Sequence, residues 1–163
     1  GIEAIDSLLS RGGMTSMMFT ISLVLLALSM GGLLFTLGIV QSLLKKVESL
    51  LTSVGKVISA AAFTAIGVNV LIGEQYLSIL LTGETFQSHF KKVGLANKNL
   101  ARVMEDAGTV VNPLVPWSVC GIFITDVLSI STMDYLPFAF FCLLCPVLTI
   151  LFGLTGKTLT YNK

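Results

Sequence analysis

The amino-acid sequence predicts an all-α, polytopic transmembrane helical protein. Of its 163 residues, 54% are apolar and 12% are charged, and the mean hydropathy is +0.90, whereas soluble domains have about 25% charged residues. Long apolar stretches are separated by short polar turns, and glycine or proline interrupts several of them. Because one helical crossing needs about 20 residues, the chain has room for about four to six crossings or half-crossings of a lipid bilayer.

The first apolar block, 14–44, contains no charged residue. A continuous helix of this length would be about 45 Å long, against a hydrocarbon thickness of about 30 Å. Gly31 and Gly32 near its centre predict either a long tilted helix with a packing notch or a helical break that faces a cavity. A polar turn around Lys45 follows the block. Because the chain starts without Met and enters this block almost directly, we expect a further segment to precede it.

Residues 57–86 form a transmembrane or re-entrant segment. Gly73 breaks its apolar pattern, and Glu74 follows with apolar residues on both sides. An acid at membrane depth costs about 2.5–3.5 kcal/mol on insertion scales and is a candidate functional residue. At a helix N-terminus near the interface the same charge is well tolerated, so both interpretations stay open.

The most polar stretch, 87–102, is predicted to be a cytoplasmic amphipathic loop, because it carries the largest basic cluster of the chain. The cluster consists of Lys91, Lys92, Lys98 and Arg102. The turn at 45–56 is also basic, which conflicts with a single crossing between the two. A segment that dips into the membrane and returns at Gly73 would remove the conflict.

The next segment, 103–131, is predicted to be an interrupted transmembrane helix. Pro113 and Pro116 lack a backbone donor and disfavour helix in the residue before them. Irregular backbone at membrane depth is tolerated only where it is buried in protein or lines a watery cavity, and transporters use such breaks to bind ions. The alternative is a loop segment with structural prolines and an interfacial Trp117.

Oxygen-bearing side chains at this interruption, together with Glu74, are the candidate ion or substrate ligands. They are Asp106, Thr109, Asn112, Ser118, Glu105 and Glu74. Asp106 is the titratable group that could exchange a hard monovalent cation for a proton, and Asp126 is a weaker candidate. The predicted structural breaks are Gly31, Gly32, Gly73, Gly108, Pro113 and Pro116. A last segment, 135–156, is predicted to be one spanning helix kinked by Pro146.

Several function classes are not expected. The net charge is +1 and no run of Lys or Arg exceeds two residues, so nucleic acid is not an expected partner. Cys120, Cys142 and Cys145 lie in apolar segments and are read as packing residues. His89 lies in the polar stretch with no second ligand at metal spacing. We therefore expect no cofactor, no resident metal and no enzymatic chemistry.

Four runs resemble, in order, the C-terminal half of the NhaC family of Na⁺/H⁺ antiporters, which includes malate/lactate exchangers. The runs are "LSRGGMTSMMFTISLVLLALSMGG", "NVLIGEQYLSILLTGETF", "EDAGTVVNPLVPWSVCG" and "YLPFAFFCLLCP". The family's acidic and Thr-containing motif falls on Glu105, Asp106, Gly108 and Thr109. Its Pro-rich continuation falls on Asn112, Pro113, Pro116 and Trp117, and its Glu-Gln-Tyr motif on Glu74, Gln75 and Tyr76.

The resemblance implies a multi-pass antiporter of the bacterial inner membrane, built from two inverted repeats with broken or re-entrant helices. This chain would supply one repeat and would need the N-terminal half of the carrier. The expected cargo is Na⁺ and H⁺, with or without an organic acid such as malate or lactate, and a homodimer is an open alternative to a monomer. The alternative function is a non-transporting membrane subunit that scaffolds a partner complex.

Overall fold

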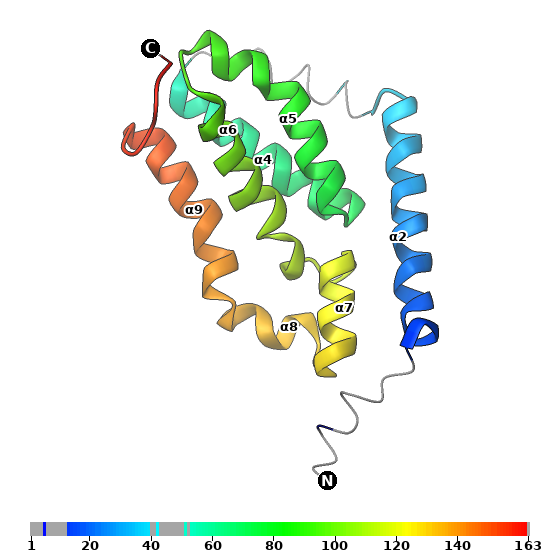
Figure 1. Ribbon diagram of the computed structural model, residues 1–163. Coiled ribbons are helices and arrows are strands. Elements are labelled where there is room, and N and C mark those ends of the chain that lie inside the picture. The colour runs from blue at the N-terminus through cyan, green and yellow to red at the C-terminus, as the bar shows by residue number, and fades with distance from the viewer. Residues whose placement is uncertain (1–4, 6–12, 40–41, 43–50, 52, 163) are drawn as a thin grey trace.

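The computed structural model describes residues 5, 13–39, 42, 51 and 53–162 (Figure 1). Within these ranges the chain is helical, with an isolated β-bridge between Leu95 and Tyr161 and no strand. This confirms the prediction of an all-α protein. The α-helices are α2 (Gly13–Thr36), α4 (Val54–Ile72), α5 (Gln75–Lys92), α6 (Asn97–Met104), α7 (Val119–Leu128), α8 (Thr132–Tyr135) and α9 (Phe140–Thr155). The polar turn predicted around Lys45 lies outside the described residues.

Two of the described helices are long and apolar enough to cross a membrane by themselves, over Met17–Leu34 and Val54–Ile72. Two further candidate spans are bent pairs. Asn97–Leu114 and Val119–Leu128 meet at 44°, and Thr132–Phe138 and Phe140–Thr155 meet at 58°. Length and composition therefore fit the transmembrane architecture that the sequence predicts.

Helices α4 and α5 form a hairpin whose tip is Gly73 and Glu74, and they lie side by side (Figure 1). Gly73 ends α4 in the left-handed region with φ of 76°, a conformation that disfavours every residue with a Cβ atom. The side chain of Glu74 then caps α5 by accepting the backbone N–H of Leu77 at 2.9 Å. The hairpin brings the start of α4 and the end of α5 to the same end of the molecule.

Helix α4 is the centre of the packed core, because α5, α6 and α9 all contact it. Its buried face is built from small and β-branched residues, which let neighbouring helices approach closely. A Cβ atom on Gly153 of α9 would lie 2.5 Å from Ile58, so only glycine fits at that contact. The apolar core cluster also contains Phe86 and Phe90 of α5.

The interrupted segment starts as α6 and changes helix type twice. A π-helix, Glu105–Thr109, follows α6 directly, and its backbone bond joins Val110 N to Glu105 O at 3.0 Å. A 3₁₀ turn, Asn112–Leu114, then carries Pro113 in its first turn, where the missing N–H is harmless. The predicted loop at 87–102 comprises the last turns of α5, a short connection and most of α6.

The last segment has a bend that the sequence does not predict. Pro146 lies inside α9, which continues unbroken from Phe140 to Thr155. The 58° bend lies before α9, next to the 3₁₀ turn Leu136–Phe138, which contains Pro137. The helix predicted over 135–156 is therefore divided at Ala139.

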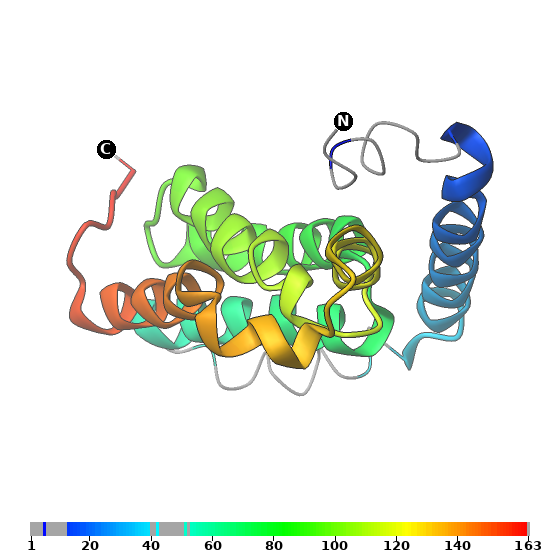
Figure 2. The same ribbon diagram turned by 90° about the horizontal axis from the view of Figure 1, so that it is seen from below.

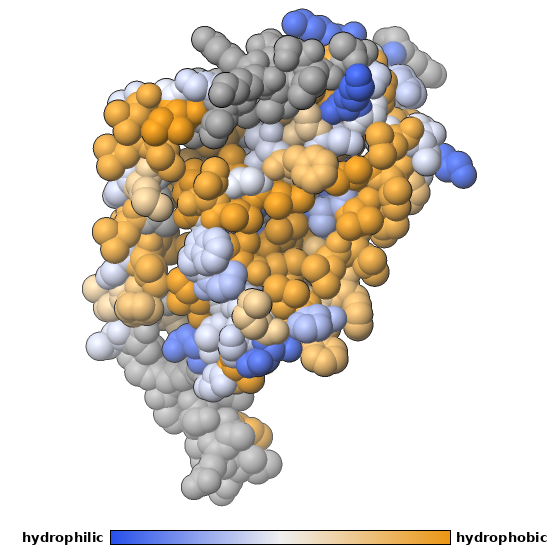
Figure 3. Space-filling model, turned by 180° about the vertical axis from the view of Figure 1, so that it is seen from behind, coloured by the Kyte–Doolittle hydropathy of each residue, from blue (hydrophilic) through white to orange (hydrophobic). Residues whose placement is uncertain are grey.

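Helix α2 lies at one edge of the molecule (Figure 2). It continues through Gly31 and Gly32 without a break. Of the two predicted alternatives, the structure therefore shows the long helix and not the helical break. A Cβ atom at Gly31 would lie 2.2 Å from the side chain of Leu77, and the Cβ position of Gly32 has no neighbour within 4 Å. Only 6% of Met17–Leu34 is buried. Apolar residues also cover most of the face seen in Figure 3, as expected of surface that meets lipid or other membrane helices.

Candidate functional site

The tip of the α4–α5 hairpin meets the interruption between the 3₁₀ turn and α7, and we call this meeting point the crossing. A Cβ atom on Gly73 would lie 3.0 Å from the carbonyl oxygen of Trp117 and 3.3 Å from Cα of Ser118. The backbone N–H of Val119 donates to Gly73 O at 3.0 Å. The indole N–H of Trp117 donates to Val70 O at 2.7 Å. Backbone groups released by the two breaks therefore satisfy one another.

A chain of amide hydrogen bonds runs through the crossing. The N–H of Cys120 donates to Asn112 Oδ1 at 3.2 Å, and Asn112 Nδ2 donates to Asn69 Oδ1 at 2.7 Å. Asn69 Nδ2 then donates to the carbonyl of Gly108. Both asparagine side chains are completely buried. We call this chain the amide relay, and it connects α4, the π-helix, the 3₁₀ turn and α7.

Ser118 fixes the turn that leads into α7. Its hydroxyl donates to Asn112 O at 2.6 Å and accepts the N–H of Gly121 at 2.9 Å, which caps the new helix. On the other side, the hydroxyl of Tyr135 donates to Pro113 O. Side chains from the N-cap of α7 and from α8 thus bind two carbonyls at the proline break, and Asn112 O also accepts the backbone N–H of Val115 at 3.1 Å.

Asp106 lies on the π-helix but belongs to a different contact from the amide relay. Its half-buried carboxylate accepts a hydrogen bond from the hydroxyl of Thr149 on α9. Thr149 itself is buried. Asp106 and Gly108 are two residues apart, yet the first is bound to α9 and the second to α4. π-Helical turns are often found at functional sites, and here the turn presents an acid and a bound carbonyl to two neighbouring helices.

The other predicted ligands lie farther from the amide relay. Thr109 donates to Glu105 Oε2 at 3.1 Å, and the carboxylate side of this pair is exposed. Glu74 is buried at the hairpin tip, where its carboxylate caps α5. The structure therefore brings Asn112, Ser118 and the Glu74 turn together at the crossing. It leaves Glu105, with Thr109, on the exposed side of the π-helix.

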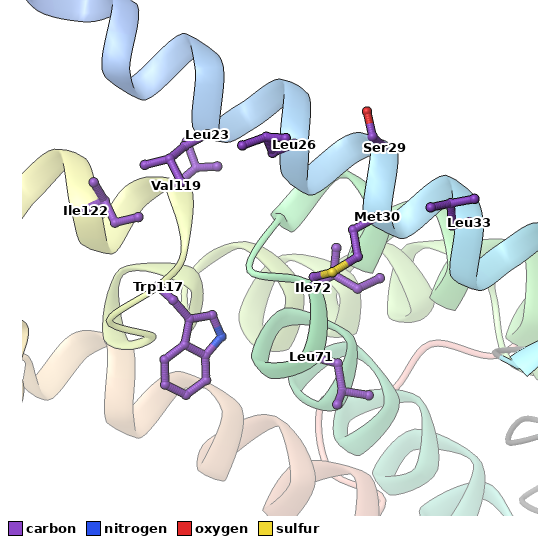
Figure 4. A pocket seen from close by; sticks show the side chains of 10 residues that line it. All are labelled: Leu23, Leu26, Ser29, Met30, Leu33, Leu71, Ile72, Trp117, Val119 and Ile122. Atoms are coloured by element: carbon purple, nitrogen blue, oxygen red, sulfur yellow. The ribbon is translucent and has the colours of Figure 1, made fainter.

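An apolar cavity of about 510 Å³ separates α2 from the crossing (Figure 4). Leu26 and Met30 line it from α2, and Ile72, Trp117 and Val119 line it from the crossing. Trp117 stays 58% exposed at this wall. The polar groups of the crossing therefore face α4, the π-helix and α7, and apolar side chains shield them on the α2 side.

The Na⁺/H⁺ antiporter family matches residues 1–157, which is nearly the whole chain. The chain belongs to the Na⁺/H⁺ antiporter family. The resemblance found in the sequence is thereby confirmed, and with it the reading of the apolar helices as parts of a membrane protein.

Three relatives of this family member are similar over nearly its full length. It is 53% identical to the Na⁺/H⁺ antiporter NhaC of Alkalihalophilus pseudofirmus over 96% of the chain and 34% of that protein. It is 41% identical to the Na⁺/H⁺ antiporter NhaC of Bacillus subtilis over 95% of the chain and 34% of that protein. It is 33% identical to the malate-2H⁺/Na⁺-lactate antiporter of Bacillus subtilis over 99% of the chain and 35% of that protein.

The chain thus spans about a third of the length of these antiporters. No solved structure matches it.

Sequence reasoning missed two side chains that the structure places at this candidate site, Asn69 and Thr149. Asn69 carried a usable signal, since it is an amide inside the apolar run "VISAAAFTAIGVNVLI", and buried polar residues in membrane helices are often functional. Thr149 carried none, because a threonine hydroxyl can bond to the carbonyl one turn earlier in its own helix. Only the packing of α9 against the π-helix identifies it.

The remaining candidates take no part in the crossing. Asp126 is exposed on α7. His89 lies in the last turn of α5, within 3.2 Å of Thr85 O. Among the residues that the structure describes, no group of three or more His, Cys, Asp or Glu side chains could hold a metal ion.

Proposed function

We propose that this chain is part of a secondary antiporter that exchanges Na⁺ for H⁺ across the inner membrane of a bacterium. The names of the NhaC relatives support this cargo. The malate-2H⁺/Na⁺-lactate relative supports an organic acid as additional cargo. Because the chain spans about a third of these proteins, the transporting unit includes the remainder of the carrier. The chain acts by binding and moving ions and has no enzymatic role.

The observation that carries the proposal is the position of Asp106 beside the crossing. The π-helix places its carboxylate two residues from Gly108, whose carbonyl ends the amide relay. Discontinuous helices of transporters place carbonyls and helix ends near bound ions. We assign Asp106 as the group that holds Na⁺ when ionised and releases it when protonated.

Neutral oxygens complete the proposed site. Asn112 and Ser118 contribute amide and hydroxyl oxygens at the crossing, which suit a hard monovalent cation. Thr109 and Glu105 lie on the exposed side of the same π-helix, and Glu74 lies at the hairpin tip. The proposed binding segment therefore runs over residues 105–118 and is closed on one side by residues 73–74.

The basic residues support a membrane orientation. The start of α4, the end of α5, the start of α6 and the end of α9 lie at one end of the molecule (Figure 1). Asn99 Nδ2 bonds Thr160 O at 2.6 Å, and Arg102 bonds Thr158 Oγ1 at 3.1 Å, which joins α6 to the segment after α9. We propose that this end faces the cytoplasm, in line with the positive-inside tendency. The hairpin then enters and returns on that side, which removes the conflict between the two basic turns.

The test is Na⁺-driven proton flux in everted membrane vesicles that contain the full-length carrier. Asp106→Asn keeps the size and polarity of the side chain but removes its charge, so we expect the flux to be abolished while membrane insertion stays normal. Asp126→Asn is the matched control, since it removes an exposed acid from α7, and it should retain the flux. Unchanged flux in Asp106→Asn would overturn the assignment.

The scaffold alternative is tested by co-expression. Cells that produce this chain together with the remainder of the carrier should show Na⁺/H⁺ exchange, and cells that produce either part alone should not. If the assembled carrier shows no exchange but retains an unrelated membrane complex on purification, the chain is a scaffold subunit and the antiport proposal is wrong.

A further inference from the structure

Asn69 is a polar residue on the otherwise apolar, buried face of α4. Its exposed fraction is 0%, and its neighbours on that face are Ala65, Val68 and Ile72. Burial of an amide away from water is costly unless its donors and acceptors are bonded. In Asn69 both ends of the amide are bonded, and neither bond lies within α4.

The orientation of each amide in the relay is fixed by the backbone at its ends. The carbonyl of Gly108 can only accept, so the group of Asn69 that faces it is the NH₂. The N–H of Cys120 can only donate, so Asn112 turns its oxygen toward α7. The middle bond then has to run from Asn112 Nδ2 to Asn69 Oδ1, which is the observed 2.7 Å contact. A single arrangement satisfies all four groups.

The relay connects three successive pieces of backbone that do not form one continuous helix. Gly108 belongs to the π-helix, Asn112 to the 3₁₀ turn and Cys120 to the first turn of α7. Asn112 Nδ2 also lies 3.5 Å from Gly73 O at the hairpin tip. Asn69 is the member of the relay that lies on α4, and it reaches this segment across 39 and 43 positions of the chain.

We propose that Asn69 is a positioning residue for the ion site, which holds the carbonyl of Gly108 and the side chain of Asn112 in the arrangement that binds Na⁺. The inference rests on the proposed function for its link to transport, but the geometry of the relay is independent of the cargo. Asn69 acts through Asn112 and Gly108. Loss of its amide releases both at once and leaves a buried carbonyl without its donor.

Asn99 offers a matched comparison, because it is another buried asparagine whose bonds involve no residue of the relay. Its Nδ2 donates to Ala96 O at 3.0 Å and to Thr160 O at 2.6 Å, and its Oδ1 accepts Thr160 N at 3.1 Å. These bonds lie at the basic end of the molecule, away from the crossing. Asn99→Ala therefore reports what the loss of a buried amide does to this fold without touching the relay.

The first measurement is the Na⁺ concentration that gives half-maximal flux in the full-length carrier, normalised to the amount inserted in the membrane. We expect Asn69→Ala to raise this concentration at least tenfold and Asn99→Ala to leave it within twofold of the unsubstituted carrier. Asn69→Leu keeps the branched shape and fills the site, so it separates packing from hydrogen bonding. It should behave like Asn69→Ala, and normal Na⁺ dependence in Asn69→Leu would overturn the inference.

The second measurement does not depend on transport. In a full-length carrier whose other cysteines are replaced by serine, the rate at which a membrane-permeant maleimide labels Cys120 reports the opening of the first turn of α7. Asn69→Ala should speed this labelling several-fold, and Asn99→Ala should not. Equal labelling in all three proteins would overturn the positioning role. Absence of Na⁺-driven flux in the unsubstituted carrier would instead overturn the proposed function, so the two failures are distinguishable.

Discussion

The hydroxyl of Thr149 on α9 donates a hydrogen bond to the carboxylate of Asp106, 43 positions away on the π-helix. Thr149 is only 2% exposed, and Asp106 is half-buried. A hydrogen bond to a charged acceptor is stronger than one between neutral groups and has a defined direction. Helix α9 therefore orients the acid of the proposed ion site, although α9 contributes no residue to the amide relay.

Thr149→Val should weaken Na⁺ binding, because it keeps the branched shape of the side chain and removes the donor. Hydrogen bonds to charged groups are worth about 1.5–3 kcal/mol. We therefore expect the Na⁺ concentration that gives half-maximal flux to rise at least about tenfold. Thr149→Ser restores the hydroxyl and should restore much of the affinity. Thr155→Val, on the same helix, is the control, because among the described residues the Thr155 hydroxyl bonds only backbone carbonyls of α9 itself, those of Leu151 and Phe152. Equal Na⁺ dependence of Thr149→Val and Thr155→Val would contradict the role of Thr149.

Gly73→Ala should destabilise the carrier for two separable reasons. A left-handed φ of 76° costs about 1–2 kcal/mol for a residue with a Cβ atom, and the new atom would also press on Trp117 O at 3.0 Å. Gly156→Ala carries the first cost alone, since its φ is 72° and its Cβ position has no neighbour within 4 Å. The thermal unfolding midpoint of the purified full-length carrier should therefore fall further in Gly73→Ala. Equal midpoints would show that the crossing is not closely packed at Gly73.

Tyr135→Phe should loosen the interruption from the α8 side. The phenol donates to Pro113 O, a carbonyl at the proline break that no other side chain is seen to bind in the described part of the chain. Loss of one such bond costs about 0.5–1.5 kcal/mol, and the same unfolding measurement would detect it. Tyr76→Phe alters an exposed phenol at the start of α5 and should have no effect. A neutral result for Tyr135→Phe would mean that α8 does not support the break.

Cysteine substitutions in a cysteine-free full-length carrier test the hairpin topology. Lys56→Cys at the start of α4 and Lys91→Cys at the end of α5 should both react with an impermeant reagent from the cytoplasmic side. Met133→Cys, on exposed α8 at the other end, should react from the outside. Labelling of Lys56→Cys and Lys91→Cys from opposite sides would show that this segment passes through the membrane once and does not return to the cytoplasmic side.

The interruption of 103–131 could be predicted from the sequence because its cause is local. Proline has no N–H and disfavours helix in the residue before it. The run "NPLVP" therefore interrupts the helix, whichever helices this segment packs against. The hairpin turn was also readable, since Gly73 followed by an acid marks a helix end and a new helix start. The bend before α9 could not be predicted in this way. It lies at Ala139, after a 3₁₀ turn that contains Pro137, and Pro146 lies inside the continuous helix α9.

The partners of the site residues could not be predicted, because they depend on helix packing between distant segments. Asp106 meets Thr149, and Asn112 meets Asn69, at separations of 43 positions in both pairs. The sequence placed Thr109 and Asp106 among the candidate ligands at one interruption, and the hydroxyl of Thr109 bonds Glu105. The assignment of Asp106 as the exchanging acid stays a prediction, whereas its hydrogen-bond partner follows from the position of α9.

We propose that one carboxylate, Asp106, binds Na⁺ and H⁺ in competition. Proton release measures this most directly when Na⁺ is added to the purified full-length carrier in a weakly buffered solution, with K⁺ as the salt control. We expect the unsubstituted carrier and Asp126→Asn to release protons on addition of Na⁺ and Asp106→Asn to release none. Undiminished proton release from Asp106→Asn would contradict the role of Asp106, because another group would then exchange the two ions.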